Sequence, residues 1–532
     1  MEKSKEFDYV IVGAGSAGCV LANRLSSRPE TRVLLLEAGS RDNDVYIQMP
    51  GGALKLLPSR RHNWYYSTEP QLHAGNRSLY WPRGKVLGGS SSINVLLYIR
   101  GHASDYDGWA DAGNPGWAFS DVLPYFKRSE GRIPPEPKWH GTTGLLRVAP
   151  SEMHNPLAKA FLEAGQRAGH AITTDFNGQS QEGIGIYDKN IHQGQRYSSA
   201  VAFLRPALKR KNLSVEVNAH ALKIKFSGSR AVGVIYGQRG KLVHAHAARE
   251  VLLTSGTVNS PQLLMLSGVG PATALRKLGI EVNADLPGVG RNLQDHLDCS
   301  IQTECRLPVS DHKFTGLLKS TIIRTQWRMF RTGPGARISI DGGAFLRSSP
   351  SSDLPDLQYH FCPSLLYDHG RKPTNCHGYT LRFCLLRPKS AGWIALRSSD
   401  PYDAPMIQPN YLSESADIQP LWNGVRQARE ILAQSSFEQF RGKELSPGLS
   451  ISADAEIEDW IRLNAESIYH PVGTCRMGND ESAVVDSALR VHGVEGLRVI
   501  DASIMPSIVG GNTNAPTMMI AEKGADLILN GD

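Results

Sequence analysis

One histidine near the end of the 532-residue chain has the clearest capacity for chemistry. His470 precedes Pro471, and a proline restricts the backbone of the residue before it, so the imidazole has a defined placement. A histidine whose pKa lies near 7 can take the hydroxyl proton of an alcohol while the carbon gives up a hydride. Because the chain contains 17 histidines, the residue type alone does not assign this role to His470.

The first glycine-rich turn of the chain indicates what kind of scaffold positions such a residue. An apolar run from Tyr9 to Val12 is typical of a strand buried on both faces, and it is followed by Gly13-x-Gly15-x-x-Gly18. Gly13 permits a sharp bend, Gly15 lets the backbone approach a pyrophosphate, and Gly18 lets the next helix pack closely on the strand. The N-terminus of that helix would face the anion, with Ser16 and Ala17 beside it.

A second apolar strand supports the same interpretation. Residues 33–36 end at Glu37, close to the spacing of about 20 residues at which an acid meets an adenosine ribose. Strand, glycines, helix, strand and acid in this order predict a site for an adenine dinucleotide. The alternative is a glycine-rich turn that binds no ligand.

Composition and charge limit the classes of function. The net charge of +7 is mild for this length, and no zinc-finger or basic-tail pattern is present, so we expect no nucleic-acid partner. Seven irregularly spaced cysteines without a C-x-x-C pair predict reduced thiols and no metal site. No run of about 18 apolar residues is present and the short N-terminal stretch is charged, so we expect a cytoplasmic protein with no membrane span.

A second glycine-rich cluster covers residues 83–94. Its paired glycines and serines suit a loop that opens a helix, with backbone N–H groups free to meet an anion or a cofactor ring. An ordinary capped turn would have the same composition.

Together these motifs resemble the glucose–methanol–choline family of flavin oxidoreductases. The resemblance extends from residue 8 to about residue 527. Besides the two glycine-rich segments, it rests on residues 254–271, 287–296, 469–478, 501–503 and 511–517.

The resemblance implies that the dinucleotide is FAD, which the first turn alone does not distinguish from NAD. It also implies that His470 is the base near flavin N5 and that Asp501 contacts the ribityl or pyrophosphate region; helix capping by Asp501 is the alternative. The predicted cofactor-binding residues are Gly13, Gly15, Ser16, Ala17, Gly18, Glu37, Ala38, Arg83, Gly84, Val86, Gly88, Gly89, Ser90, Asn94, Val95, Asp501, Ala502, Asn512 and Thr513.

An asparagine is the expected companion of His470, since family members place histidine or asparagine at that point. An amide can hydrogen-bond an oxygen that develops alkoxide character. We predict that Asn514 is this partner, with Asn512 as the competing candidate. The alternative for Asn514 is that it only caps the helix beginning near Pro516.

Two positions bear on the cofactor and the substrate. Some family members carry a histidine, covalently joined to the flavin, just before the position of Asn94; here that residue is Ile93, so we predict non-covalent FAD. Choline-acting members place a carboxylate near the position of Asp341. We favour a structural or salt-bridged role for Asp341, because a lone acid is a weak signal.

The predicted fold class is α/β plus α+β. We expect a Rossmann-like FAD-binding domain and a substrate-binding domain built on an antiparallel sheet flanked by helices. The predicted segments are FAD-binding 1–155, substrate-binding 156–210, FAD-binding 211–300, substrate-binding 301–460 and a C-terminal FAD-binding part 461–532 that carries the active-site residues.

The resemblance implies oxidation of a small-molecule primary alcohol to an aldehyde, with electrons passed to a quinone or another acceptor. Residues 368–372 and 468–473 favour medium-chain aliphatic alcohols, whereas residues 440–448 favour choline. Choline or a sugar alcohol therefore remains an alternative substrate. An oxidase of the same fold that delivers electrons to O₂ and makes H₂O₂ is the alternative activity.

A basic amphipathic stretch lies outside these motifs. Residues 313–331 contain Lys313, Lys319, Arg324, Arg328 and Arg331 and no acidic residue, with apolar residues at mostly helical spacing. Such a helix can lie on an anionic membrane surface, here the inner face of the membrane. We favour a helix packed on its own domain with a solvated basic edge.

Overall fold

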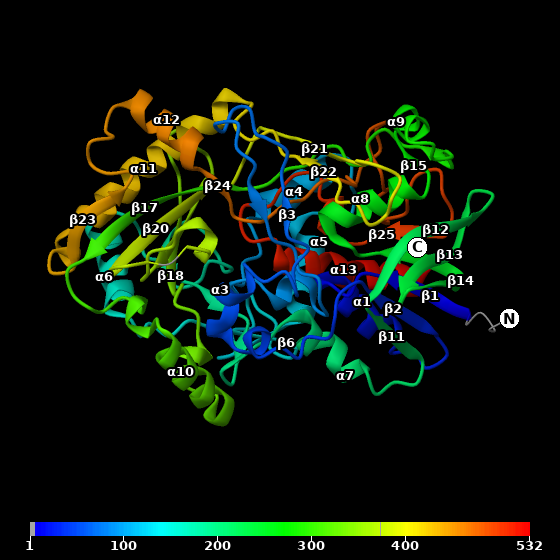
Figure 1. Cartoon of the computed structure of the whole chain (residues 1–532), viewed down its shortest axis with the longest axis horizontal. Coiled ribbons are helices and arrows are strands. Elements are labelled where there is room, and N and C mark those ends of the chain that lie inside the picture. The colour runs from blue at the N-terminus through cyan, green and yellow to red at the C-terminus, as the bar shows by residue number, and fades with distance from the viewer. Residues whose placement is uncertain (1–5, 373, 532) are drawn as a thin grey trace.

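Two seven-stranded sheets form the two halves of the molecule in the computed structural model, which describes residues 6–372 and 374–531. They lie side by side in Figure 1, the first on the right and the second on the left. This arrangement agrees with the predicted fold class.

The first sheet is organised around β1 (Glu6–Val12), whose last four residues are buried as predicted. Its strand order is β11-β2-β1-β14-β13-β12, with β25 paired to β14. Pairing is parallel from β11 to β14 and between β14 and β25, and antiparallel from β14 to β12. The other strands are β2 (Val33–Glu37), β11 (Leu213–Val217), β12 (Ala219–Ser227), β13 (Arg230–Gln238), β14 (Lys241–Leu253) and β25 (Leu497–Val499).

Helices α1 (Ser16–Leu25) and α13 (Asn514–Asn530) pack against each other beside this sheet. Arg24 donates two hydrogen bonds to the buried Glu522, at 2.8 and 2.6 Å, and so joins segments almost 500 residues apart. The remaining helices are α2 (Val45–Gln48), α3 (Ala53–Leu56), α4 (Ala103–Asp111), α5 (Phe119–Ser129), α6 (Pro156–Arg167), α7 (Arg205–Ala207), α8 (Gly256–Leu266), α9 (Ala272–Lys277), α10 (Leu317–Phe330), α11 (Ile418–Ala433) and α12 (Asp454–Asn464).

The second sheet is antiparallel in the order β23-β17-β20-β19-β18-β7, with β24 paired to β17. Helices α6 and α11 pack against it. Its strands are β7 (Gly183–Ile186), β17 (Leu297–Cys305), β18 (Gly342–Leu346), β19 (Leu357–Cys362), β20 (Gly378–Leu385), β23 (Arg441–Ser446) and β24 (Glu466–Ser467).

Some local details differ from the sequence predictions. The proposed boundary at residue 300 falls inside β17, because Cys299 and Ile301 are both buried and continue the strand. The helix expected after the second glycine cluster is only a 3-10 turn, Gly89–Ser92. The division of the chain into five segments stays a prediction.

The remaining strands are short and pair outside the two large sheets. They are β3 (Tyr66–Ser67), β4 (Tyr80–Trp81), β5 (Glu130–Arg132), β6 (Leu146–Pro150), β8 (Asp188–Lys189), β9 (Ile191–His192), β10 (Gln195–Arg196), β15 (Val269–Gly270), β16 (Ala284–Asp285), β21 (Trp393–Ala395) and β22 (Met406–Gln408). Among the described residues, no helix is both long enough and apolar enough to cross a bilayer.

Candidate active site

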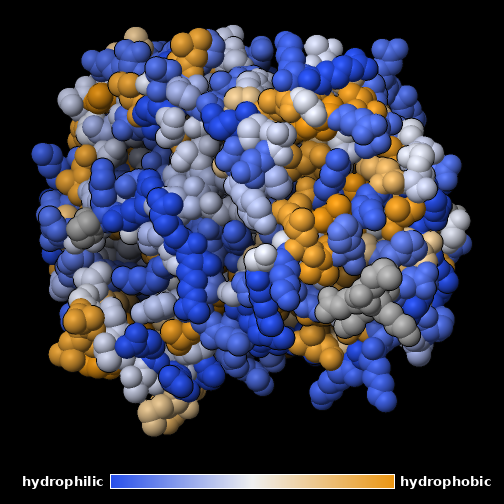
Figure 2. Space-filling view, turned by 45° about the vertical axis from the view of Figure 1, so that its right-hand side comes forward, coloured by the Kyte–Doolittle hydropathy of each residue, from blue (hydrophilic) through white to orange (hydrophobic). Residues whose placement is uncertain are grey.

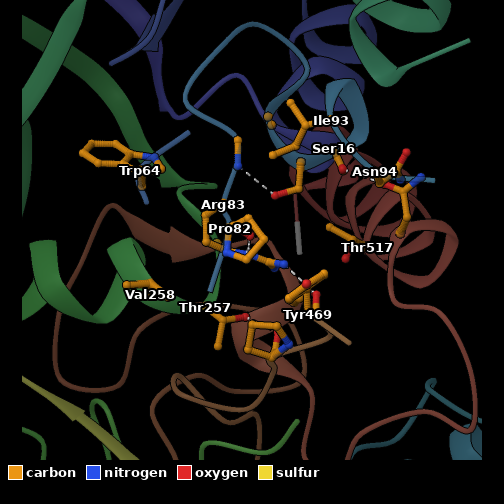
Figure 3. A pocket seen from close by; sticks show the side chains of 18 of the residues that line it. Ser16, Trp64, Pro82, Arg83, Ile93, Asn94, Thr257, Val258, Tyr469 and Thr517 are labelled. Carbon is orange, nitrogen blue, oxygen red and sulfur yellow. Dashed lines mark hydrogen bonds between the residues drawn. The ribbon is translucent and has the colours of Figure 1, made fainter. Parts of the chain in front are cut away.

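A cavity of about 310 Å³ is lined by both glycine-rich segments, by the ends of β2 and β19 and by the C-terminal segment. Figure 3 shows Arg83 in the middle of one wall, reaching Tyr469, with Trp64 on one side and Ile93 and Asn94 on the other. Arg83 donates a 2.6 Å hydrogen bond to the main-chain oxygen of Tyr469. The cavity therefore brings together segments that are far apart in the sequence.

Most of the predicted cofactor-binding residues line this cavity. Those that line it are Gly13, Gly15, Ser16, Ala17, Glu37, Ala38, Arg83, Gly84, Gly89, Ser90, Asn94, Val95, Asp501, Ala502, Asn512 and Thr513. Gly18, Val86 and Gly88 do not. Val86 packs in a small apolar cluster with Ile93, and Gly88 donates its N–H to Ala14 at 2.7 Å, so both support the wall from behind.

Two of the glycines let backbone segments of the protein approach each other closely. A Cβ at Gly13 would lie 2.7 Å from the main-chain oxygen of Thr254, and one at Gly89 would lie 2.7 Å from the Cα of Gly15. A Cβ at Gly18 would lie 1.9 Å from the oxygen of Gly13, so Gly18 serves helix–strand packing. Helix α1 has no side-chain cap, and its N-terminal Gly15, Ser16 and Ala17 line the cavity. These features fit the pyrophosphate of a dinucleotide.

Glu37 lies at the end of β2 as predicted, and its carboxylate is held by the backbone. It accepts hydrogen bonds from the N–H groups of Ala14, at 3.0 Å, and Gly39, at 2.8 Å. Burial raises the pKa of Glu37 to about 7. These contacts fix the acid at the edge of the cavity, where a ribose hydroxyl could reach it.

Asp501 has the capping role that was the alternative for this residue. Its carboxylate accepts from the N–H of Ser503 at 2.8 Å, from the N–H of Gly256 at 2.9 Å and from the Ser260 hydroxyl at 2.6 Å. Asp501 lines the cavity, but these bonds occupy its oxygens with protein donors. It therefore ties the start of α8 to the segment that follows β25.

His470 lies at the centre of a buried network. Its Nδ1 is 3.0 Å from Nδ1 of His296, and its Nε2 is 3.0 Å from the amide nitrogen of Asn512. The N–H of His470 donates to Asp295 at 2.7 Å, which fixes the backbone. Burial lowers the pKa of His470 well below its ordinary value, so the ring is neutral near pH 7.

The network determines which nitrogen of His470 carries the proton. His296 Nε2 lies 3.2 Å from the main-chain oxygen of Leu386, which can only accept, so Nε2 of His296 holds the proton. Burial lowers the pKa of His296 to about 3, so the ring is neutral and its Nδ1 accepts. His470 must then donate from Nδ1, and its unprotonated Nε2 accepts from the NH₂ of Asn512.

The other end of the network leads to the same assignment. The Tyr187 hydroxyl donates to the main-chain oxygen of Tyr359 and therefore accepts from Nε2 of Gln358, 3.3 Å away. Gln358 donates to the side-chain oxygen of Asn512 at 3.0 Å, which turns the NH₂ of Asn512 towards His470. A main-chain carbonyl at each end thus orients every group between them.

The structure corrects the choice of asparagine. Asn512, not Asn514, contacts His470. Asn514 begins α13, and its oxygen accepts from the Ser16 hydroxyl at 2.7 Å, so it lies beside the dinucleotide turn. The prediction placed the partner at the first residue of the helix, whereas the amide that reaches His470 lies before the helix begins.

Several residues of the site were not predicted. Asp295 and His296 belong to the quoted segment 287–296, and an acid–histidine pair there was a readable signal. Gln358 gave no sequence signal, since it lies within the buried strand β19. His360, Cys362 and Arg382 line the cavity from β19 and β20.

Asp341 is salt-bridged, which is the role that the sequence favoured. Lys189 donates to Asp341 at 2.6 Å, and both side chains are buried, so the carboxylate already has a cationic partner. Ile93 is buried and lines the cavity with an alkyl side chain.

Comparison with known proteins agrees over nearly the whole chain. Family models described as GMC oxidoreductase match residues 7–298 and 388–521. The chain is 49% identical to human choline dehydrogenase, mitochondrial, over 99% of this chain and 90% of that protein, and 47% identical to the Pseudomonas putida alcohol dehydrogenase [acceptor], over 98% and 96%. The crystal structure of pyridoxine 4-oxidase from Mesorbium loti superposes with a TM-score of 0.90 at 32% identity, covering 99% of each chain.

Proposed function

Because this chain belongs to the GMC oxidoreductases, FAD-dependent enzymes that act on alcohols, we propose that it oxidises a primary alcohol to an aldehyde with His470 as the base. The unprotonated Nε2 of the buried, neutral His470 supports this proposal most directly. That atom has no proton of its own and lies beside an amide donor.

The residues of the site divide the work between proton and oxygen. FAD, when bound, supplies the acceptor for the hydride. Nε2 of His470 takes the hydroxyl proton, and the NH₂ of Asn512 donates to the substrate oxygen as negative charge develops there. His296 keeps the His470 ring oriented by accepting from its Nδ1. Loss of one proton and one hydride from RCH₂OH leaves the aldehyde.

The proposed cofactor contacts follow from the lining of the cavity. The N-terminus of α1 and the glycines of both turns would hold the pyrophosphate, and Glu37 would meet the adenosine ribose. FAD would be bound without a covalent link, because Ile93 offers no nucleophile. Acid precipitation should release the flavin into the supernatant, and flavin retained in the protein pellet would contradict this proposal.

We propose a neutral alcohol as the preferred substrate. Among the described residues that line the cavity, the carboxylates are Glu37 and Asp501, and backbone N–H groups occupy both. Arg382 also lines the cavity and is paired with Asp298, and Lys189 neutralises the nearby Asp341. A quaternary ammonium group would therefore lack a free anionic partner. Choline is the second candidate, because choline dehydrogenases are among the relatives.

A panel of alcohols tests substrate and acceptor together. The purified flavoprotein is mixed anaerobically with medium-chain alcohols, choline or a sugar alcohol and a quinone-like dye, and the assay is repeated with O₂ alone. We expect the lowest KM for the neutral medium-chain alcohols and rapid turnover only with the dye. Preference for choline would contradict the substrate proposal, and comparable H₂O₂ production with O₂ would contradict the quinone-type acceptor.

A further inference from the structure

Helix α10 exposes several large apolar side chains. Leu317, Leu318, Ile322, Met329 and Phe330 have exposed fractions between 56% and 88%. Trp327 is the only residue of the helix that is buried. The sequence predicted a helix packed on its own domain with a basic edge. In the structure only part of the apolar residues of α10 face the protein, and the others face solvent.

The helical period explains this division. At about 100° per residue, Leu318, Ile322 and Met329 fall on one side, and Ile323 and Trp327 fall on the opposite side. The inner side is fixed to the protein: the indole N–H of Trp327 donates to the main-chain oxygen of Gly194 at 2.7 Å. The outer apolar side is therefore held in place and turned towards solvent.

The same region is strongly basic. Residues 312–340 contain Lys313, Lys319, Arg324, Arg328, Arg331 and Arg337 and no acidic residue. Within the described parts of the chain, none of these six side chains forms an ion pair. Their charges are thus available to an anionic partner.

The surface continues towards the cavity. After α10 the chain forms the turn Pro334–Ala336, which packs against the turn Pro50–Gly52 just before α3. On α3 Leu54 lines the cavity and is 37% exposed, and Lys55 follows it. Figure 1 shows α10 projecting at the lower left of the molecule, and Figure 2 shows hydrophobic and hydrophilic residues together on the lower left edge at about that height.

We propose that the outer side of α10 docks on an anionic lipid membrane. Leu318, Ile322 and Met329 would enter the boundary between headgroups and acyl chains, while the basic side chains meet lipid phosphates. An apolar ridge with a basic surround matches a lipid surface in both polarity and charge. Docking would turn the side of the cavity near Leu54 towards the bilayer, so a quinone dissolved in the lipid could reach the cavity. Only the access of the quinone rests on the proposed function.

Vesicle co-sedimentation tests the docking. Holoprotein is mixed at low salt with vesicles of phosphatidylcholine alone or with about 30 mol% phosphatidylglycerol. We expect binding to the anionic vesicles only, with loss at high salt. Leu318→Ser combined with Ile322→Ser, and separately Lys319→Glu combined with Arg328→Glu, should each lower the partition coefficient more than about tenfold. The matched control Leu242→Ser, an exposed leucine on β14, should leave it unchanged.

Three outcomes would overturn the proposal: no binding of the unchanged protein to anionic vesicles, equal binding by the α10 variants, or a dimer in solution that both α10 variants dissociate. The last would show that the occupant is a second copy of the chain. Turnover with a water-soluble dye should be the same in all variants, because these residues lie outside the catalytic machinery. Absence of dye-dependent turnover in the unchanged protein would instead contradict the proposed function.

Discussion

The network around His470 and the surface of α10 differ in whether their side chains find interaction partners within the protein. From Tyr187 to His296 the network is buried, and each side chain in it is hydrogen-bonded to the next; among the described residues, only Oε1 of Gln358 in this network lacks a partner. On the outer side of α10 the apolar groups are exposed, and its basic side chains form no ion pair with any residue that the structure describes.

This difference indicates which outside molecule each region is built to bind. In the network, a substrate hydroxyl can replace the contact between Nε2 of His470 and Asn512, so the substrate is the group that this region lacks. On α10 the protein supplies one side only, so its partners must come from outside. A substitution in the network should therefore affect turnover, whereas one on the outer side of α10 should affect location.

The largest effect is expected for His470→Ala. Loss of the base should reduce turnover by about 10²–10⁴-fold, because general base catalysis typically contributes about that factor. Steady-state kinetics with a dye acceptor measure it, and the flavin absorbance should show that the cofactor remains bound. The exposed His244→Ala is the matched control. Turnover within about tenfold of the unchanged enzyme would remove His470 as the base.

The two asparagines provide the next test. Asn512→Ala should lower kcat by about 10²-fold, because it removes the donor to the developing alkoxide. Asn514→Ala should leave kcat within a few-fold and weaken flavin retention, since Asn514 contacts Ser16. Kinetics and flavin titration distinguish the two. The reverse pattern would restore Asn514 as the partner.

A smaller effect is expected for Gln358→Leu, which removes the group that orients Asn512. The amide would then be free to turn, and kcat should fall about tenfold with little change in KM. Gln358→Glu retains an acceptor but only one donor when protonated, so it should not restore the full rate. An effect on KM alone would indicate that Gln358 shapes substrate binding and does not position Asn512.

The pH dependence of kcat/KM should reflect the neutral His470. A base with a lowered pKa is unprotonated above that pKa, so activity is present above it and is lost as the pH falls through it. The plateau should therefore extend below pH 6.5. Asp295 contacts the backbone of His470, and burial raises its pKa to about 6, so its titration falls close to this pH range. His296, His360 and Arg83 also face the His470 ring. An inflection at or above pH 6.5 would contradict a neutral, buried base.

The smallest effect is expected on the stability of α10. Leu318→Ser with Ile322→Ser should change the free energy of unfolding by no more than about 0.5 kcal/mol, because exposed side chains contribute little. Trp327→Ala, on the buried side, should cost about 3–5 kcal/mol. Denaturant titration measures both. A large loss from the outer pair would show that this side packs against protein.

The cofactor side of the fold was readable from the sequence because local rules govern it. Gly13, Gly15 and Gly18 serve a turn whose geometry depends on adjacent residues, and Glu37 lies at the end of the next strand. Local spacing therefore carries most of the information about that half of the cavity.

The reactive side was less readable because long-range packing decides it. Whether Asn512 or Asn514 reaches His470 depends on where α13 begins, and a shift of two residues is within the ordinary uncertainty of a helix boundary. Gln358 is buried on a strand that gives only an alternation signal. The two-sided apolar pattern of α10 likewise depends on how much of the helix the rest of the protein covers.

The order in which the chain is synthesised gives the C-terminal segment a further consequence. The cavity walls up to residue 401 are made first, whereas His470, Asp501 and Asn512 are added later, and Arg24 on α1 finds its partner Glu522 later still. A nascent chain that lacks these residues has an incomplete cavity, and its α1 lacks the packing partner α13. Stable binding of the flavin should therefore follow synthesis of this segment. A new molecule should then acquire its flavin absorbance only after the last residues have been translated.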